Sequence, residues 1–292
     1  MNKNNICCVI VSYNIGKKIY KCYDSISKQV DRIIIVDNGS DKNTVNVLKE
    51  LSKNKNTIII FNDENLGIAT ALNQGAKIAI KENYKWLLTM DNDSIASNKM
   101  IENMILSYNE LNSEEKQNIV SIFPNHIEEK FADDYNYYNE DKKEYIEYEI
   151  TSGNLIKLDV LSKIGFWNEN LFIDYVDYEL CLRLSINDYK MLKVNNSILI
   201  HNLGNSVKKR FLNKTIIVGN HSFIRRYYIT RNRLFIWKKY EKYNSLFVKN
   251  DKNKFVKEIF IILLYEEYKI KKIKMIIKGI KDYKINKYGK CN

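Results

Sequence analysis

Residues 86–94 read WLLTMDNDS, and this stretch decides the fold. Residues 86–90 form an apolar run of strand length, which ends at two aspartates separated by one residue, Asp91 and Asp93. Such a run is typical of a buried parallel strand, and open α/β sheets bind ligands outside the carboxyl ends of their strands. Because Mg²⁺ and Mn²⁺ prefer carboxylate oxygens and often share them with phosphates, the stretch predicts a cation site facing a diphosphate. The simpler alternative is a turn in which Asp93 or Ser94 caps the next helix.

Three similar apolar runs precede this strand, and segments with helical spacing separate them. The expected strands are residues 6–11, 33–36 and 58–61, and the expected helices are residues 17–28, 44–52 and 68–80. We expect Ser40 or Asp41 to cap the second helix, and small residues such as Gly75 to let the third helix pack closely. This alternation is typical of a parallel sheet with helices on both faces.

Each of the four strands is followed by polar residues. The carboxyl ends of parallel strands lie along one edge of a sheet, so we expect these clusters to lie together. No GxGxxG or GxxxxGK[ST] motif follows the first strand, which disfavours a dinucleotide site and a phosphate-loop NTPase. The clusters contain Ser12, Tyr13 and Asn14, then Asp37 and Asn38, then Asn65 and Gly67, and finally Asp91, Asn92 and Asp93.

The second half of the chain adds two candidate site residues. We expect Asp177 to begin a helix, where the helix dipole keeps a carboxylate ionised and fit to act as a general base; a plain helix cap explains it equally well. His201 follows a strand-like segment, residues 197–200, and is either structural or a third metal ligand. Residues 128–149 are charged and rich in tyrosine, which predicts a long exposed loop, with or without a short hairpin, as a candidate acceptor-side loop.

Composition excludes several classes of protein. The chain has 292 residues, of which 45% are hydrophobic, so it can form one large α/β domain with an appendage. Its five cysteines show no paired spacing, which favours reduced thiols over disulfides or a zinc site. The N-terminus has no signal-peptide pattern, and no apolar run has the length of a membrane span. We therefore expect a cytoplasmic protein.

The net charge of +12 is concentrated late in the chain, from Lys208 onward. A basic region indicates an anionic partner, such as nucleic acid, a phosphorylated substrate or an anionic membrane surface. Two helices are expected here, residues 225–243 and 255–268, both with interleaved aromatic and basic residues. These helices either bind the inner face of the membrane or pack on the rest of the protein with their charges facing water.

Several motifs together resemble the family 2 glycosyltransferases of the GT-A fold, and within them the rhamnosyltransferase-like group. Each motif is short, but their order and spacing are specific, and they cover nearly the whole chain. They are VIVSYN (9–14), IIVDNGSD (34–41), NLGIATALNQG (65–75), MDNDS (90–94), SGNLI (152–156), LFIDYVDYELCLR (171–183), HNLGNS (201–206) and YYITRNRLFIWKKY (227–240).

The resemblance implies a role for each matching residue. Asp91 and Asp93 would hold the metal ion and the donor diphosphate, and His201 would reach the metal or the diphosphate. Asp177 would be the catalytic base, although Val176 stands where the family usually has an acid; Asp174 and Glu179 are therefore alternative base or acceptor contacts. The implied contacts of the donor nucleotide are Ser12, Tyr13, Asn14, Asp37, Asn38, Asn65, Gly67, Asn73, Asp91 and Asn92, with Asn38 replacing an acid that some members have.

The prediction is a metal-dependent inverting hexosyltransferase with Mn²⁺ or Mg²⁺ as cofactor. The expected fold is a GT-A type, Rossmann-like, mostly parallel sheet flanked by helices, with a C-terminal helical extension. We assign residues 1–215 to the catalytic domain (1–95 for the nucleotide sugar, 96–215 for the acceptor) and residues 216–292 to a basic, amphipathic helical region. The expected donor is dTDP-rhamnose, with a UDP-sugar as the alternative, and the expected acceptor is a glycan or lipid-linked glycan of a surface polysaccharide such as O-antigen or capsule.

Two other function classes compete with this prediction. A non-catalytic nucleic-acid-binding protein would explain the positive charge and the interleaved Tyr and Arg, but it would cluster its basic residues on a recognition element. A nucleotidyltransferase also uses paired acids and a metal, but it would usually carry a glycine-rich basic loop after the first strand, of which residues 12–18 are a poor version. We therefore expect no nucleic-acid partner, and the sequence leaves the oligomeric state open.

Overall fold

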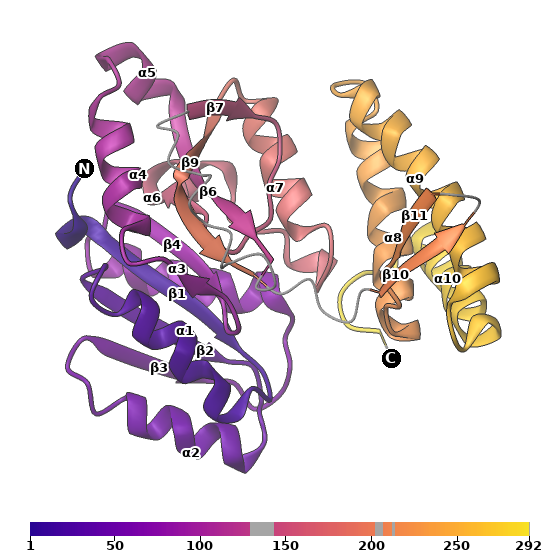
Figure 1. The fold of residues 1–292 in the computed structure, drawn as a ribbon, viewed down its shortest axis with the longest axis horizontal. Coiled ribbons are helices and arrows are strands. Elements are labelled where there is room, and N and C mark those ends of the chain that lie inside the picture. The colour runs from indigo at the N-terminus through magenta and orange to yellow at the C-terminus, as the bar shows by residue number, and fades with distance from the viewer. Residues whose placement is uncertain (129–142, 202–206, 212–213, 292) are drawn as a thin grey trace. The chain divides into compact units, whose positions relative to one another are not determined.

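A computed structural model describes residues 1–128, 143–201, 207–211 and 214–291 (Figure 1). The chain divides into two compact units. Unit 1 comprises Met1–Glu169 and Val176–Asn202, and unit 2 comprises Asn170–Tyr175 and Leu203–Asn292. The predicted functional division at residues 95 and 215 stays a prediction, because compactness does not show which residues bind donor or acceptor.

The first half of unit 1 has the predicted β-α alternation. Its four parallel strands lie side by side in the order β3-β2-β1-β4. The N-cap of the second helix is Asp41, whose carboxylate accepts a hydrogen bond from Thr44 N at 2.8 Å. The elements are η1 (Lys3–Asn5), β1 (Ile6–Ser12), η2 (Gly16–Lys18), α1 (Ile19–Ile26), β2 (Arg32–Asp37), α2 (Lys42–Leu51), β3 (Thr57–Phe61), α3 (Ile68–Lys81) and β4 (Trp86–Asp91).

Different helices cover the two faces of these strands, as predicted. The side chains of Ile6, Cys8 and Ile10 on β1 join a buried cluster with apolar residues of α1, α2 and α4. Val9, which points to the opposite face, lies against α3: a Cβ added at Gly75 would be 2.5 Å from a Val9 methyl group. Glycine at position 75 is therefore required by the close approach of α3 to the sheet, and the alternation of β1 side chains fixes the register of the sheet between its helical layers.

The second half of unit 1 extends the same sheet to nine strands among the described residues. From β4 the sheet continues in the order β8-β6-β9-β5, and β7 pairs with β9. Strand β8 is antiparallel to β4 and β6, β6 is parallel to β9, and β5 and β7 are antiparallel to β9. The elements are β5 (Ile95–Ala96), α4 (Met100–Asn109), α5 (Ser113–Asn118), β6 (Ile119–Ile127), β7 (Lys143–Ile146), β8 (Leu155–Lys157), α6 (Leu158–Ile164), η4 (Glu169–Leu171), α7 (Val176–Ser185) and β9 (Lys190–Ile200).

Two expectations for this half need correction. The strand-like segment expected at residues 197–200 is the end of a longer strand, β9, whose pairing with β6 shifts register between Pro124 and Asn125. Asp93 and Ser94 cap no helix, because β5 follows them and α4 begins after Lys99, which makes no side-chain cap. The predicted acceptor loop, residues 128–149, contains β7, and its residues 129–142 lie outside the described part of the chain.

Unit 2 consists of a hairpin and three helices, α8, α9 and α10. The hairpin joins β10 (Val207–Phe211) to β11 (Lys214–Val218), and the helices are α8 (Phe223–Tyr240), α9 (Ser245–Tyr265) and α10 (Lys269–Lys284). The second predicted helix, residues 255–268, is α9, which begins earlier and ends before Tyr268, where the backbone is left-handed (φ 53°). Helix α10 and the hairpin were not predicted. Of the helices in the described ranges, none has the length and apolar character needed to cross a membrane.

The interior of unit 2 contains ion pairs between its helices. Arg226 of α8 contacts Glu266 at 2.5 Å, and Lys272 of α10 contacts the same carboxylate at 2.9 Å. Arg233 of α8 contacts Asp251 at 3.0 Å. The charged side chains of a predicted amphipathic tail are therefore, in part, the internal contacts of a packed unit.

Candidate functional site

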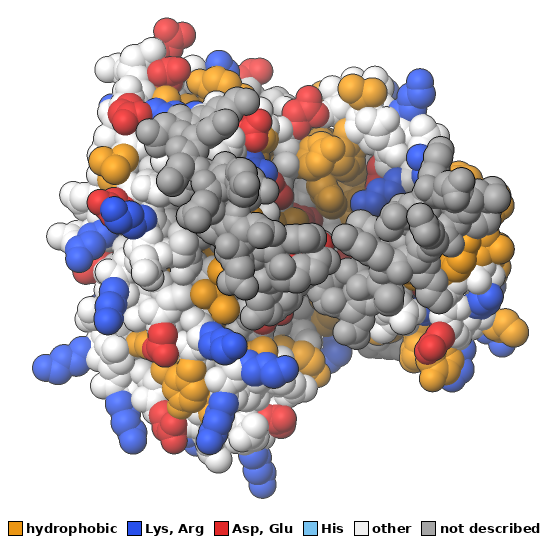
Figure 2. Space-filling model, in the orientation of Figure 1, with side chains coloured by type: hydrophobic (Ala, Val, Ile, Leu, Met, Phe, Trp, Pro, Cys, Tyr) orange, Lys and Arg blue, Asp and Glu red, His pale blue; other side chains and the backbone are white. Residues whose placement is uncertain are grey.

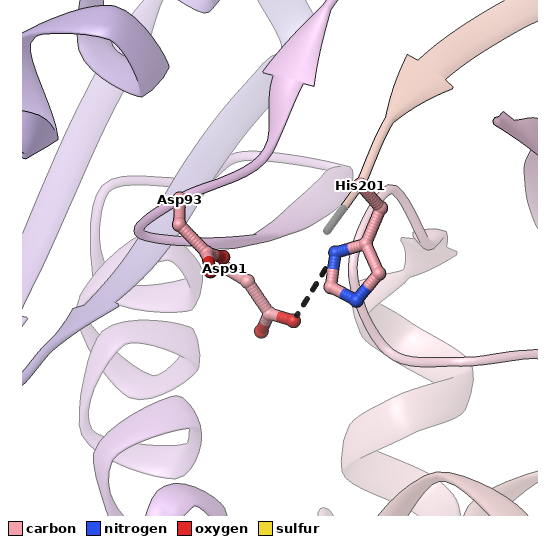
Figure 3. A group of neighbouring side chains, drawn as sticks. All are labelled: Asp91, Asp93 and His201. Carbon is pink, nitrogen blue, oxygen red and sulfur yellow. Dashed lines mark ion pairs between the residues drawn. The ribbon is translucent and has the colours of Figure 1, made fainter. Parts of the chain in front are cut away.

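Asp91, Asp93 and His201 form the group that could hold a metal ion (Figure 3). One ligand atom from each lies within 4.8 Å of the others, and the Nδ1 atom of His201 is 3.9 Å from Oδ2 of Asp91. Two carboxylates and an imidazole suit Mn²⁺ or Mg²⁺. The structure thus brings His201 beside two aspartates that lie 110 and 108 positions earlier in the sequence.

The sheet itself positions these residues. Asp91 ends β4, and the chain then turns so that β5 lies antiparallel to the end of β9, with Ile95 opposite Ile200. His201 follows Ile200 directly, and its backbone N–H donates to the carbonyl of Ile127 at 2.9 Å. The turn that carries Asp93 is therefore fixed beside His201 by backbone pairing.

Two buried serines connect Asp91 to His201. The backbone N–H of Asp91 donates to Oγ of Ser152 at 3.0 Å, Oγ of Ser152 lies 2.9 Å from Oγ of Ser94, and Ser94 Oγ lies 2.9 Å from Nδ1 of His201. In the tautomer in which Nδ1 donates to Ser94, the lone pair of Nε2 is left for an ion. Both nitrogens lie on the ring edge turned toward Asp91 in Figure 3. A metal-bound histidine commonly donates its second N–H in this way.

Cys22 lies behind the same carboxylates. Its thiol donates to the carbonyl oxygen of Asp91 at 3.2 Å. Burial, and then the charges of Asp91 and Asp93, raise the pKa of this thiol. Cys22 therefore stays protonated and acts as a hydrogen-bond donor beneath the site.

The ends of β1 and β2 carry the predicted nucleoside contacts. Ser12 and Asp37 are paired across the two strands and are both buried. Asp37 Oδ2 accepts from Ser40 N at 3.0 Å, but among the described residues Ser12 Oγ and Asp37 Oδ1 are buried without a hydrogen-bond partner. Tyr13, the next residue, is 49% exposed. Buried polar atoms without partners are rare in native proteins, so a ligand group at this edge would account for them.

Other predicted donor contacts hold the surrounding loops together. Asn38 is buried; its Nδ2 donates to Gly67 O at 3.1 Å and to Asn65 Oδ1 at 3.2 Å, and its Oδ1 accepts from Leu66 N at 3.1 Å. Asn14 Oδ1 accepts from Asp41 N at 2.8 Å. Asn38 therefore shapes the loop after β3, a role that an acidic side chain could not fill because it has no N–H to donate.

Asn73 has partners of a different kind. It is 3% exposed, and its amide donates to Trp167 O at 2.9 Å and to Glu169 Oε1 at 2.8 Å while accepting from Trp167 N at 3.0 Å. These contacts fix the segment after α6 against α3. They use both N–H groups of the amide, which favours a structural role.

The three acids considered for the catalytic base lie in different surroundings. Asp177 is partly buried in the first turn of α7, where its Oδ1 accepts from Tyr178 N at 2.8 Å. Glu179 is 1% exposed and contacts Arg183 at 2.8 Å, and Arg183 also donates to Phe166 O at 2.6 Å. Asp174 belongs to unit 2, where burial raises the pKa of its carboxyl although Arg225 contacts it at 2.9 Å.

A family model described as glycosyl transferase family 2 matches residues 7–158. The chain belongs to this family. It is 27% identical over 243 residues to a dTDP-rhamnosyl transferase of Shigella flexneri, covering 78% of each protein. It is also 27% identical over 225 residues to an uncharacterized glycosyltransferase of Methanocaldococcus jannaschii, covering 70% of this chain and 73% of the relative.

Two solved structures share the fold of this glycosyltransferase. One is GalNAc-T7 with UDP, GalNAc and Mn²⁺, at a TM-score of 0.61 and 14% identity over 81% of this chain and 48% of that one. The other is a mannosyltransferase from Pyrobaculum calidifontis in complex with GDP-Man and Mn²⁺, at a TM-score of 0.56 and 13% identity over 79% of this chain and 62% of that one. The chain thus spans about half to two thirds of these proteins. The predicted GT-A fold with C-terminal helices is confirmed.

The face of unit 1 drawn in Figure 2 bears on the nucleic-acid alternative. Figure 2 shows Lys and Arg side chains projecting mostly singly from the face in view, with neutral and acidic side chains between them. A nucleic-acid-binding domain would concentrate them in a patch or stripe.

The contact that Ser152 makes at the site was not predicted from the sequence. The motif of Ser152 was recognised without a role for this residue, and Ser94 was considered only as a helix cap.

Proposed function

We propose that this glycosyltransferase is a metal-dependent inverting enzyme that transfers rhamnose from dTDP-rhamnose to a hydroxyl of a growing surface polysaccharide, such as O-antigen or capsule. The observation that carries the proposal is the convergence of Asp91, Asp93 and His201 at the carboxyl edge of the sheet. The rhamnosyl relative, which matches 78% of the chain, supports the choice of donor.

Asp91, Asp93 and His201 would hold Mn²⁺ or Mg²⁺ together with the donor diphosphate. A bound divalent ion would neutralise the charge of the leaving nucleoside diphosphate. Ser94 and Ser152 would keep His201 in the orientation that presents Nε2. The ligand set comes from the ends of two rigid strands, so the site needs little rearrangement before it binds.

The nucleoside would lie over Ser12, Tyr13 and Asp37. The buried Asp37 Oδ1 can accept the imide N–H that thymine and uracil share, and Tyr13 offers an exposed ring for stacking. This contact selects a pyrimidine with an N–H at that position but does not distinguish dTDP from UDP. A UDP-sugar donor is therefore the second candidate, supported by the same residues.

Asp177 would take the proton from the acceptor hydroxyl as that oxygen attacks the anomeric carbon. Its place in the first turn of α7 stabilises the carboxylate through the helix dipole. The two other acids are bound to arginines, Glu179 to Arg183 and Asp174 to Arg225. Asp177 is the residue that matches the base of the family, and Glu179 and Asp174 are the alternatives.

Calorimetric titration with a panel of nucleotide sugars, with and without Mn²⁺, tests the donor and the metal together. We expect dTDP-rhamnose to bind in Mn²⁺, and Asp91→Asn to weaken this binding at least about 10-fold because one ligand charge is lost. Glu102→Gln, on the first turn of α4, serves as the matched control. Equal affinity of the wild type and Asp91→Asn in Mn²⁺ would remove the metal assignment, and tighter binding of a UDP-sugar would replace the donor.

We further propose that unit 2 contacts an anionic membrane surface, where a lipid-linked acceptor would be found. Four large apolar side chains on α9 are exposed at helical spacing, and Phe260 is 61% exposed. Exposed lysines accompany them, among them Lys257 and Lys271, and an apolar face beside basic residues suits anionic lipid headgroups. The four residues are Val256, Phe260, Leu263 and Leu264.

Flotation with vesicles that contain anionic lipid tests this contact. We expect the full-length protein to float with these vesicles at low salt and Phe260→Asp to remain at the bottom. Tyr145→Asp is the matched control, since Tyr145 is a comparably exposed aromatic residue of unit 1. Flotation of Phe260→Asp at the wild-type level, or no flotation of either protein, would refute the membrane contact.

A further inference from the structure

The segment Asn170–Tyr175 departs from ordinary backbone geometry. Although it interrupts unit 1 in sequence, it belongs to unit 2. Phe172, Asp174 and Tyr175 each have a φ of 64°, in the left-handed region that aromatic residues rarely adopt. Such conformations persist only where the surroundings impose them, and they cluster at functional sites.

Two adjacent residues of α8 hold the backbone of this segment. Asn232 Nδ2 donates to Leu171 O and Ile173 O at 2.8 Å each, and to Asp174 O at 2.9 Å. Arg231 Nη2 donates to Asn170 O and Leu171 O at 3.1 Å each. Both side chains are fully buried. The carbonyl groups that the unusual backbone turns inward are thus satisfied by side chains of α8.

The side chains of the segment are held as well. Arg233 Nε donates to Tyr175 Oη at 2.7 Å, and Tyr175 Oη donates to Asp251 at 2.8 Å. The ring of Phe172 stacks on Tyr228 with centroids 5.0 Å apart. Consecutive residues Arg231, Asn232 and Arg233, within the TRNR part of a motif that the family resemblance left without a role, therefore all act on one short segment.

Helix α7 begins directly after Tyr175, and Asp177 is its second residue. We propose that Arg231, Asn232 and Arg233 are positioning residues for the transfer reaction: by fixing residues 170–175, they set the conformation in which the chain enters α7 and presents Asp177 to the acceptor. This inference rests on the proposed role of Asp177 as base. It makes the C-terminal unit a part of the catalytic apparatus in addition to its proposed membrane contact.

The test is Asn232→Asp, which keeps the shape of the side chain but replaces the N–H donors with an acceptor facing three carbonyl oxygens. We expect kcat to fall at least about 10-fold, with the affinity for Mn²⁺ and donor unchanged, because the three candidate metal ligands belong to unit 1 and Asn232 belongs to unit 2. Hydrogen exchange of the amides of residues 170–178 should become faster. Because Asn232→Asp disturbs a buried site, Arg225→Met is the second variant: Arg225 is 49% exposed, and its loss frees only the Asp174 carboxylate.

Lys272→Met is the matched control, since it removes a buried contact of unit 2 with Glu266 and leaves residues 170–175 alone. It should lower thermal stability while kcat stays at the wild-type value. Two outcomes would overturn the inference. In the first, the amides of residues 170–178 exchange faster in both Asn232→Asp and Arg225→Met, yet both variants turn over at the wild-type rate. In the second, Lys272→Met lowers kcat as much as Asn232→Asp does. If the proposed role of Asp177 as the base is wrong, the result is different: Asp177→Asn turns over normally, while the amides of residues 170–178 still exchange faster in Asn232→Asp.

Discussion

The two units use buried polar residues in opposite ways. In unit 2, buried acids and bases neutralise one another: Arg233 contacts Asp251 and Glu258, and Glu266 lies between Arg226 and Lys272. At the sheet edge of unit 1, acids gather around a histidine, and buried oxygens of Ser12 and Asp37 have no hydrogen-bond partner in the described part of the chain. Burial of polar groups is a structural device in the first case and indicates a ligand site in the second.

This contrast gives charge a different meaning in each unit. A buried ion pair is costly to break, because the remaining charge has no solvent. A carboxylate pair at a strand end tolerates neutralisation structurally but loses its ligand. Substitutions that break the buried ion pairs of unit 2 should therefore reduce stability, while those at the edge of unit 1 should reduce binding or turnover.

The largest expected effect is on turnover. Asp177→Asn should lower kcat by about 10²–10⁴-fold, the range usual for loss of a general base, with little change in the melting temperature. Steady-state assays with the preferred donor and Mn²⁺ measure it. Asp159→Asn, on the first turn of α6, is the control, and turnover within twofold of the wild type would assign the base to another residue.

Next is the stability of unit 2. Arg233→Met should destabilise the protein by about 3–5 kcal/mol, because it leaves the buried Asp251 without its arginine and removes one of the two arginines that contact Glu258. Urea unfolding gives this difference, and Mn²⁺ affinity of the folded variant should be unchanged. A loss below about 1 kcal/mol would show that the charges of unit 2 do not behave as buried pairs.

Substitution of Ser94 in unit 1 should change metal binding alone. Ser94→Ala should weaken Mn²⁺ binding by about 10–100-fold, because His201 loses the partner that fixes its ring. Electron paramagnetic resonance titration of Mn²⁺ measures the affinity, and ¹⁵N spectra of the three histidines report the His201 tautomer. Ser27→Ala, on a half-buried residue directly after α1, is the control. Unchanged affinity and tautomer in Ser94→Ala would show that Ser94 serves only in packing.

The smallest expected effect is the pH dependence that one histidine of unit 2 gives to the stability of the protein. Burial, and then Arg225 and Arg226, lower the pKa of His221 in unit 2 to about 4, whereas the unfolded chain binds this proton near pH 6.5. The unfolded state thus holds more protons between these values, so stability should fall as the pH drops from 6.5 to 4. The loss should be at most about 2 kcal/mol for this residue, because solvent around the partly exposed ring screens its charge. Hydrogen exchange of α8 across this range measures the loss. His221→Gln should remove that part of the pH dependence; an equal loss in the variant would assign it to other groups.

The sequence predicted the parallel half of unit 1 closely, because continuous apolar runs and helical spacing leave few alternatives for residues 6–91. It also indicated Asp91, Asp93 and His201, since strand ends converge at one edge. The Ser152–Ser94 contact joins residues 58 apart through hydroxyl groups, which have no pattern in sequence. The partners of Asn73 lie 94 or more positions away.

Unit 2 was harder to predict for a physical reason. Helix α9 begins with three apolar residues after Ser245, but the polar residues 249–254 separate them from its next apolar residues. Near its start, α10 has only single isoleucines between lysines, so neither helix stands out in the sequence. Residues 170–175 include no glycine that would mark their left-handed backbone in the sequence. Their conformation depends on Arg231 and Asn232, which follow about sixty positions later. Local sequence shows what a segment prefers, whereas this segment is held by distant contacts against its preference.

The most direct test of the account is crystallographic. Crystals of the full chain grown with Mn²⁺ and dTDP should show an anomalous difference peak within coordination distance of Asp91, Asp93 and His201, with the diphosphate oxygens on the same ion. A fully occupied Mn²⁺ peak elsewhere, with dTDP bound and these three side chains unliganded, would contradict the central claim.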